Sequence, residues 1–180
     1  RAAALVELAR DYLAAGLLDR AEALFVESLE FPEYRALALR SLLDIYQQEK
    51  EWESAINAAE RLQHIDSQQL GPVMAQFACE QAERLIREHG DPSEVRRLIR
   101  RAHRYDRKCV RASILLSDIE QAEGHWRASI KACQLVEDQD VDYIPEVLPR
   151  LEQAYRATGA SSQFSAELYR LLNRYPGVSV

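Results

Sequence analysis

The sequence has few of the residues that break regular structure or carry specialised chemistry. Its 180 residues include only six glycines, six prolines and three cysteines. So little glycine and proline, with 29% charged residues, excludes collagen-like and low-complexity chains. No apolar run approaches the roughly 18 residues that span a bilayer. The cysteines Cys79, Cys109 and Cys133 are odd in number and far apart, which excludes a CxxC zinc or redox motif and suits a reducing compartment.

A helical pattern runs along the whole chain instead. Apolar residues recur at i, i+3, i+4 and i+7, and the alternating runs of exposed strands are missing. Helix breakers recur too, and the residues expected to close one helix each are Gly16, Lys50, Gly90, Gly124 and Gly159. Five residues after each of them come Ala21, Ala55, Val95, Ser129 and Phe164, which are spaced 34, 40, 34 and 35 residues apart.

A period near 34 residues with two helices per period is the tetratricopeptide pattern. We therefore predict an all-α protein, a right-handed α-solenoid of about five tetratricopeptide (TPR) helix-turn-helix repeats. The predicted repeats form one continuous domain over residues 2–34, 36–69, 75–108, 110–143 and 145–178. Each first helix is expected to line a concave groove, and each second helix to cover the convex side.

Groups that could converge for catalysis are missing from the sequence. The four histidines are spread over three of the predicted repeats, and none is paired with cysteine or carboxylate at metal-ligand spacing. There is no phosphate-binding glycine loop, nucleophile elbow or HExxH motif. The acidic stretch from Asp138 to Asp142 lacks the central glycine of a calcium loop. We expect no enzyme activity, no metal and no cofactor in this chain.

The predicted groove is the first candidate binding site. On the TPR frame the side chains expected to face it include Val6 and Cys79, and the residues predicted to bind a partner are Arg10, Leu13, Arg40, Asp44, Gln47, Glu83, Asp118, Gln121, Gln153 and Arg156. Their mixture of polar and apolar groups suits an extended or helical peptide. The alternative is a groove that is merely solvated.

The second candidate is a basic block. Residues 84–111 carry ten basic and four acidic residues, a net charge of +6, so the rest carries 13 − 25 = −12. The predicted patch lies on the convex face of one helix and comprises Arg96, Arg97, Arg100, Arg101 and Arg104. It could dock an acidic protein or an anionic membrane surface, or be only a solvated helix face. Nucleic acid is not expected, because few aromatic residues interleave with the arginines and the chain is acidic overall.

The stretch from Leu8 to Glu22 (LARDYLAAGLLDRAE) strongly resembles the lipopolysaccharide assembly protein B family of bacterial inner-membrane TPR proteins. Further segments match that family in register: Leu42–Gln47, Glu51–Trp52, Ala55–Ile56, Ala59–Leu62, Phe77–Glu80 and Leu151–Tyr155. The resemblance covers almost the whole chain and is weaker after about Gly90.

The resemblance implies a parent with an N-terminal membrane helix, cytoplasmic repeats and a C-terminal rubredoxin-like zinc or iron site. Because the chain starts at Arg1 and its cysteines cannot supply two CxxC pairs, we interpret it as the repeat region alone. The implied function is an adaptor at the cytoplasmic face of the inner membrane. It would help a membrane-bound AAA+ metalloprotease degrade the deacetylase of the lipid A pathway, and so regulate lipopolysaccharide synthesis. The alternative is a generic TPR peptide-binding module of another bacterial pathway.

Overall fold

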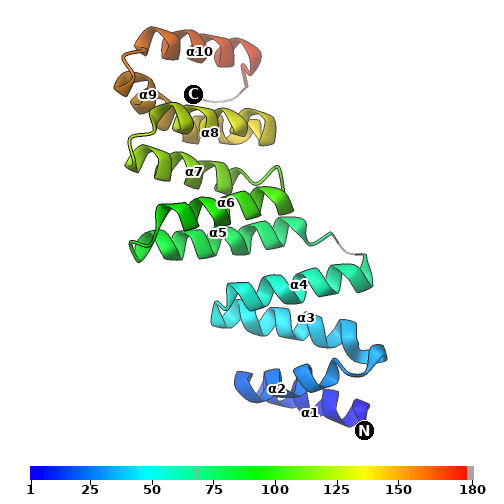
Figure 1. Ribbon diagram of the computed structural model, residues 1–180. Coiled ribbons are helices and arrows are strands. Elements are labelled where there is room, and N and C mark those ends of the chain that lie inside the picture. The colour runs from blue at the N-terminus through cyan, green and yellow to red at the C-terminus, as the bar shows by residue number, and fades with distance from the viewer. Residues whose placement is uncertain (68, 178–180) are drawn as a thin grey trace. The chain divides into compact units, whose positions relative to one another are not determined.

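The computed structural model describes residues 1–67 and 69–177 and contains no strand within them. It has ten α-helices in these ranges (Figure 1). They are α1 (Ala2–Ala14), α2 (Leu18–Ser28), α3 (Pro32–Glu49), α4 (Trp52–Asp66), α5 (Gly71–Arg87), α6 (Pro92–Tyr105), α7 (Val110–Ala122), α8 (Trp126–Gln139), α9 (Ile144–Ala157) and α10 (Ser161–Arg174), with a short 3-10 turn, η1 (Val141–Tyr143), before α9. The predicted all-α class of paired helices is confirmed. None of the described helices is both long and apolar enough to cross a membrane.

The five odd-numbered helices all end in the same way. The backbone N–H that follows each turn donates to a carbonyl five residues earlier, and the pairs are Leu17 to Tyr12, Glu51 to Tyr46, Gly90 to Leu85, His125 to Glu120 and Ala160 to Tyr155. The residue before each donor is left-handed, as is typical of this helix-capping motif. Three of these left-handed residues are glycines, with φ between 71° and 75°. The shared geometry explains the periodic turns in the sequence.

The turn after α5 corrects one expectation. Its left-handed residue is His89, with φ of 54°, and not Gly90. Gly90 follows one position later and packs tightly against Leu85, where a Cβ atom would lie 2.2 Å from the Leu85 Cδ1 atom. A larger residue at position 90 would require the Leu85 side chain to move, so glycine is favoured there by close approach and not by a left-handed conformation.

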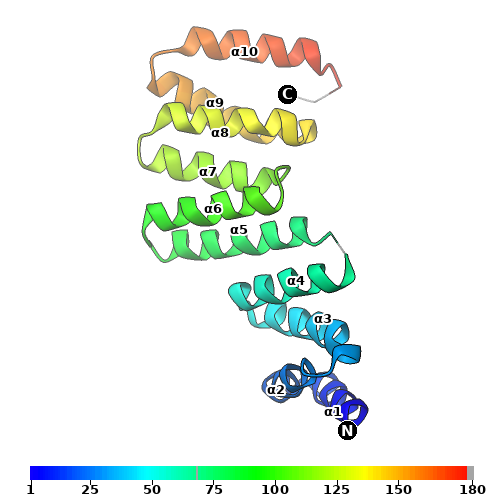
Figure 2. The same cartoon turned by 45° about the vertical axis from the view of Figure 1, so that its right-hand side comes forward.

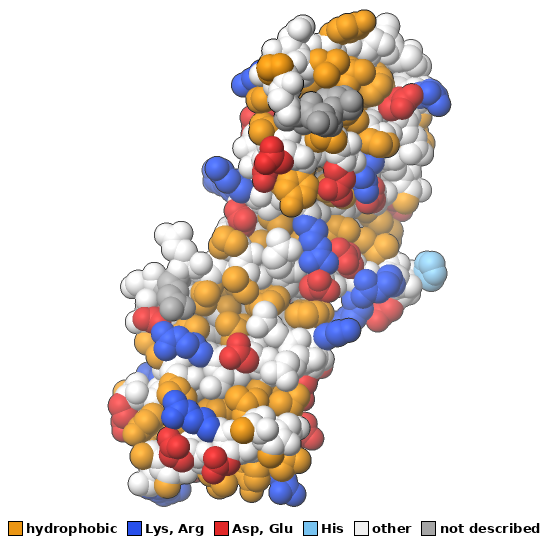
Figure 3. Space-filling view, turned by 180° about the vertical axis from the view of Figure 1, so that it is seen from behind, with side chains coloured by type: hydrophobic (Ala, Val, Ile, Leu, Met, Phe, Trp, Pro, Cys, Tyr) orange, Lys and Arg blue, Asp and Glu red, His pale blue; other side chains and the backbone are white. Residues whose placement is uncertain are grey.

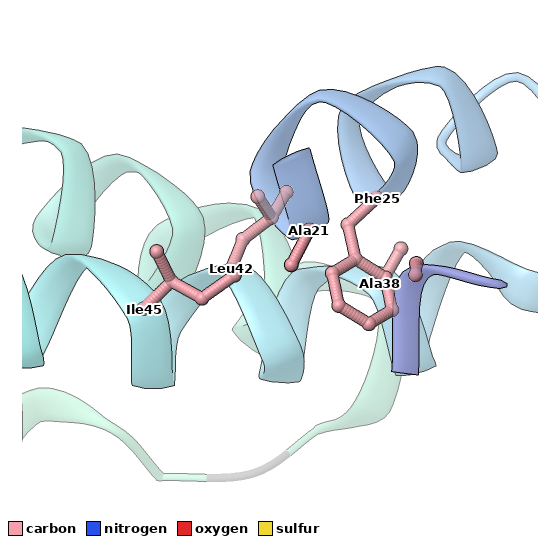
Figure 4. Packing of buried hydrophobic residues seen from close by; sticks show 6 residues of the cluster. Ala21, Phe25, Ala38, Leu42 and Ile45 are labelled. Carbon is pink, nitrogen blue, oxygen red and sulfur yellow. The ribbon is translucent and has the colours of Figure 1, made fainter. Parts of the chain in front are cut away.

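The chain divides into two compact units, Arg1–Ala78 and Cys79–Val180. In the first unit, α1 packs on α2, α2 on α3, and α3 on α4. Phe25 of α2 is fully buried and lies with Ala21 against Ala38 and Leu42 of α3 (Figure 4). Small alanines at these contacts let neighbouring helices approach closely, while Phe25 fills the space between them. On α4, Trp52 stacks on Phe77, with ring centroids 5.7 Å apart.

In the second unit, α7, α8, α9 and α10 pack in chain order (Figure 2). Val136, Val147, Leu151 and Tyr155 form an apolar cluster there. The α7–α8 contact is more polar, and its side chains satisfy one another, as buried polar groups must. The Ser117 hydroxyl lies 2.9 Å from the Ser129 hydroxyl and 3.1 Å from the Cys133 Sγ atom.

Candidate functional site

Three of the predicted groove residues meet in the first unit. Leu13 at the end of α1 and Asp44 and Gln47 on α3 line an open hollow of about 480 Å³. Its complete lining, which defines the Asp44 hollow, is Leu13, Gly16, Leu18, Asp44, Gln47 and Gln48. The left-handed turn after α1 places Leu18 opposite α3, so the hollow combines two leucines with three polar side chains.

The Asp44 hollow is negatively charged, because Asp44 is the one charged side chain of its lining. Asp44 is exposed and has no ion-pair partner among the residues that the structure describes. Glu49 follows Gln48, the last residue of the lining. Its pKa is raised above the usual range by partial burial and by the charges of Glu22 and Asp19. Tyr46 donates a 2.9 Å hydrogen bond to Glu22, and burial followed by this bond raises the pKa of Tyr46 to about 12. Carboxylates that repel one another attract cations, so this surface favours a basic partner.

The other groove residues predicted in the first unit have partners of their own. Arg10 donates to Glu7 on the same helix at 3.0 Å, and Arg40 forms an ion pair with Asp66 at the end of α4. The expectation for Val6 and Cys79 was wrong, because only 1% of Val6 and none of Cys79 is exposed. Their helices are rotated so that these small apolar side chains face neighbouring helices instead of solvent.

In the second unit the predicted groove residues join successive odd-numbered helices. Glu83 of α5 accepts a 2.8 Å hydrogen bond from Arg111 of α7, and Asp118 of α7 accepts two bonds from Arg150 of α9, at 2.6 and 3.1 Å. Gln121 turns away from solvent and donates to the Ser129 hydroxyl and the Arg150 carbonyl.

The two remaining residues of the predicted groove are exposed on α9. They are Gln153 and Arg156, and Arg156 forms an ion pair with Glu152 at 2.7 Å.

Arg111 and Arg150 were not singled out from the sequence. Arg111 also bonds Glu80, so one guanidinium ties two carboxylates of α5 to α7. A sequence signal for such pairs is an acidic and a basic residue spaced about one repeat apart. Asp118 and Arg150, for example, are separated by 32 residues. These ion pairs make Glu83 and Asp118 part of the helix packing.

The arginines of the predicted basic patch on α6 differ in their surroundings, because some form ion pairs and others are exposed without one. The expectation that Arg96 faces outward was wrong. Arg96 donates two hydrogen bonds to Glu120 of α7, at 2.6 and 3.1 Å, and a third to Glu123 at 3.1 Å. Its side chain is 20% exposed and that of Glu120 only 9%. The hydrogen bonds from Arg96, aided by His125, hold the pKa of Glu120 below its usual range.

The rest of the patch is also partly engaged. Arg97 pairs with Glu94, and Arg101 donates to the Tyr105 hydroxyl at 2.9 Å. Only Arg100 and Arg104 stay exposed without an ion pair in the described part of the chain, one helical turn apart. Figure 3 shows charges of both signs interspersed with hydrophobic side chains on one face of the molecule.

Among the described residues, no three His, Cys, Asp or Glu side chains gather in a way that could hold a metal ion. Two histidines have structural partners. The His103 Nε2 atom lies 3.1 Å from the Ser113 hydroxyl, and the His125 Nδ1 atom lies 2.9 Å from Glu120. Burial lowers the pKa of His103.

No protein-family model matches the sequence. Lipopolysaccharide assembly protein B of Haemophilus influenzae is 35% identical over 164 residues, which cover 91% of this chain and 41% of that protein. The protein of the same name from Escherichia coli K12 is 32% identical over 180 residues, covering 98% of this chain and 45% of that protein. The chain therefore spans less than half the length of these relatives.

The fold has solved relatives as well. The crystal structure of YrrB, described as a TPR protein, superimposes with a TM-score of 0.51 at 15% identity and covers 98% of this chain and 88% of that one. This likeness concerns the fold, and no catalytic family is indicated by any of the similar proteins. The resemblance drawn from the sequence is thus confirmed, and this chain is a TPR repeat protein homologous to part of lipopolysaccharide assembly protein B.

Proposed function

We propose that this chain is a protein-binding scaffold that regulates lipopolysaccharide biosynthesis and has no catalytic activity of its own. The observation that carries the proposal is the Asp44 hollow, which offers leucines and an unpaired carboxylate on the surface of a TPR fold. The name of its relatives supports the pathway. Rigid helices that present apolar and charged groups together suit recognition of a peptide segment.

The finer proposal concerns the partners. We infer that the repeat region is an adaptor that brings the deacetylase of the lipid A pathway to a membrane-bound AAA+ metalloprotease, at the cytoplasmic face of the bacterial inner membrane. The parent protein would carry its rubredoxin-like site outside this chain, so the scaffold itself needs no cofactor. The generic alternative, a TPR module of another bacterial pathway, would use the same hollow for a different protein.

The chemistry of the Asp44 hollow narrows the segment that it would bind. Two leucines favour an apolar side chain, while Asp44 and the nearby carboxylates favour Lys or Arg beside it. A hydrogen bond to a charged group contributes about 1.5–3 kcal/mol. We therefore expect a partner segment that combines basic and apolar residues.

A paired substitution tests this site. Asp44→Ala with Gln47→Ala is expected to weaken binding of the purified deacetylase or protease by about tenfold or more, because it removes the polar contacts of the hollow. Isothermal titration calorimetry with the full-length protein measures the change. Glu33→Ala, an exposed carboxylate in the first turn of the same helix, is the matched control and should leave binding unchanged. Equal losses in both variants would argue against the hollow.

The pathway is tested in cells. Replacing the full-length protein by the Asp44→Ala and Gln47→Ala variant should slow degradation of the deacetylase and raise its steady-state level, measured by immunoblotting after translation is stopped. An unchanged deacetylase half-life, together with retained binding of some other protein through the hollow, would favour the generic alternative.

The exposed part of α6 supports a second contact, with an anionic membrane surface. Each basic residue near such a surface contributes about 1 kcal/mol. Arg100→Gln with Arg104→Gln should therefore weaken binding to phosphatidylglycerol vesicles by roughly 30-fold at low salt, measured by co-sedimentation. The control is Arg127→Gln with Lys131→Gln, an exposed pair at the same spacing on α8. A membrane role for α6 is ruled out if both pairs have the same effect.

A further inference from the structure

Two cysteines from different helices meet inside the second unit. Cys79 lies on α5 and Cys109 is the residue that precedes α7, and 30 residues separate them along the chain. Their Sγ atoms are 3.8 Å apart, and neither cysteine forms a disulfide. Neither side chain is more than 3% exposed. This thiol pair, Cys79 and Cys109, has no part in the proposed binding function.

The pKa values of the two thiols are shifted in opposite directions. The hydrogen bond shared with Cys79, the backbone N–H of Ala112 in the first turn of α7 and the charge of Arg111 together lower the pKa of Cys109, against the effects of burial and of Asp106. The hydrogen bond to Cys109, followed by burial and the charge of Glu83, raises the pKa of Cys79. A thiol of low pKa beside one of high pKa is the arrangement of an attacking cysteine and a resolving cysteine.

The distance that the two sulfur atoms must close is short. A disulfide has an S–S distance of about 2.05 Å, so the sulfur atoms must approach by less than 2 Å. Arg111, two residues after Cys109, already holds α7 against α5 through Glu80 and Glu83, both at 2.7 Å. Because both sulfur atoms are buried, the start of α7 must open locally to admit the oxidant before the sulfur atoms can bond.

We propose that Cys79 and Cys109 are a two-electron oxidation site that takes hydroperoxides and closes to an intramolecular disulfide. The Cys109 thiolate attacks one oxygen of the peroxide, the O–O bond breaks, and Cys109 becomes a sulfenic acid while hydroxide leaves. The Cys79 sulfur then attacks the sulfenic sulfur, the S–OH bond breaks, and the Cys79 proton leaves with the hydroxyl as water. The proton that Cys109 released on ionising neutralises the hydroxide. Two thiols are thereby oxidised, and one hydrogen peroxide is reduced to two waters.

The third cysteine provides a matched control within the chain. Cys133 is buried like the pair, but its Sγ atom bonds the Ser117 hydroxyl at 3.1 Å, and burial raises its pKa. It therefore shares the buried environment of the pair without the lowered pKa of Cys109. Under limited oxidation it should keep its thiol.

The experiment treats the folded protein with hydrogen peroxide, then unfolds it in N-ethylmaleimide and measures the intact mass. The wild type should pass from three labels to one, and its mass should fall by about 2 Da beyond the mass of the two missing labels. Dithiothreitol before labelling should restore three labels. Cys133→Ala should pass from two labels to none. Peptide mapping should join the segments that contain Cys79 and Cys109. Three retained labels, or a crosslink through Cys133, would overturn the proposal.

A second set of variants separates chemistry from packing. Cys79→Ser keeps a hydroxyl beside Cys109 but cannot form a disulfide, so it should leave Cys109 trapped as a sulfenic acid that dimedone labels. Cys109→Ala should give no such adduct at Cys79. Circular dichroism establishes that each variant is folded before oxidation. If either variant is unfolded, the Cys133→Ala result alone decides, because that variant keeps both proposed sulfur atoms in place. Dimedone labelling that is equal at Cys79 and Cys109 would contradict the assigned roles.

Discussion

Phe25→Ala should lower the free energy of unfolding of the first unit by about 4 kcal/mol, because it removes a large buried side chain and leaves a cavity. Phe25 is fully buried among alanines and leucines of α2 and α3. The side chains of the neighbouring alanines are too short to fill the cavity. A loss of this size is a large part of the stability of an ordinary domain.

Urea titration measures this effect through the fluorescence of Trp52, which lies in the first unit. Trp126→Phe in the background removes the signal of the second unit, so that each unit is followed by itself. Val26→Ala is the matched control, since Val26 follows Phe25 on α2 and is 46% exposed. It should change the unfolding free energy by less than about 0.5 kcal/mol. Similar losses in the two variants would mean that Phe25 does not anchor this core.

Arg96→Met is expected to destabilise the second unit by about 3 kcal/mol, because it leaves Glu120 buried without its guanidinium. The cost arises from the desolvated carboxylate and not from the loss of a favourable surface ion pair. Arg96→Met with Glu120→Gln should therefore recover most of the loss, since no uncompensated charge remains. Arg100→Met, one turn along the same helix and exposed, should change stability by less than about 0.5 kcal/mol.

The pH dependence of this ion pair has a defined sign. The folded-state pKa of Glu120 lies below its unfolded value. Its contribution to stability is therefore present above the unfolded-state pKa, and it is lost as pH falls through the lowered folded-state pKa. Urea titrations from pH 7 downward, followed by Trp126 fluorescence, should show the wild type losing this stability while the double variant does not. Parallel pH profiles in the two proteins would show that Glu120 is not held ionised by Arg96.

Much of the local structure could be predicted from the sequence. Turns after Gly16, Gly124 and Gly159 are visible there because a left-handed residue favours glycine, and helices are visible through their apolar spacing. The turn after α5 was harder to read, because His89 takes the left-handed position while Gly90 is needed for space. A glycine that allows a left-handed conformation and a glycine that allows close packing cannot be told apart in a sequence.

The candidate sites were less predictable. Leu13, Asp44 and Gln47 do share a hollow, but Glu83, Asp118 and Arg96 are occupied by ion pairs with other helices. Their partners lie 24 to 32 residues away in sequence. A rotation of one helix by a fraction of a turn would exchange buried and exposed arginines without altering the repeat pattern.

By itself, then, the sequence determined that this protein is built of paired helices at a period near 34 residues, and which relatives it has. These properties depend on neighbours within one or two helical turns and on residue identity. Only the tertiary structure decided which arginines remain free and that two distant thiols lie 3.8 Å apart. The physical reason is that burial and pairing depend on how each helix is rotated against the next, and close packing of side chains sets that rotation.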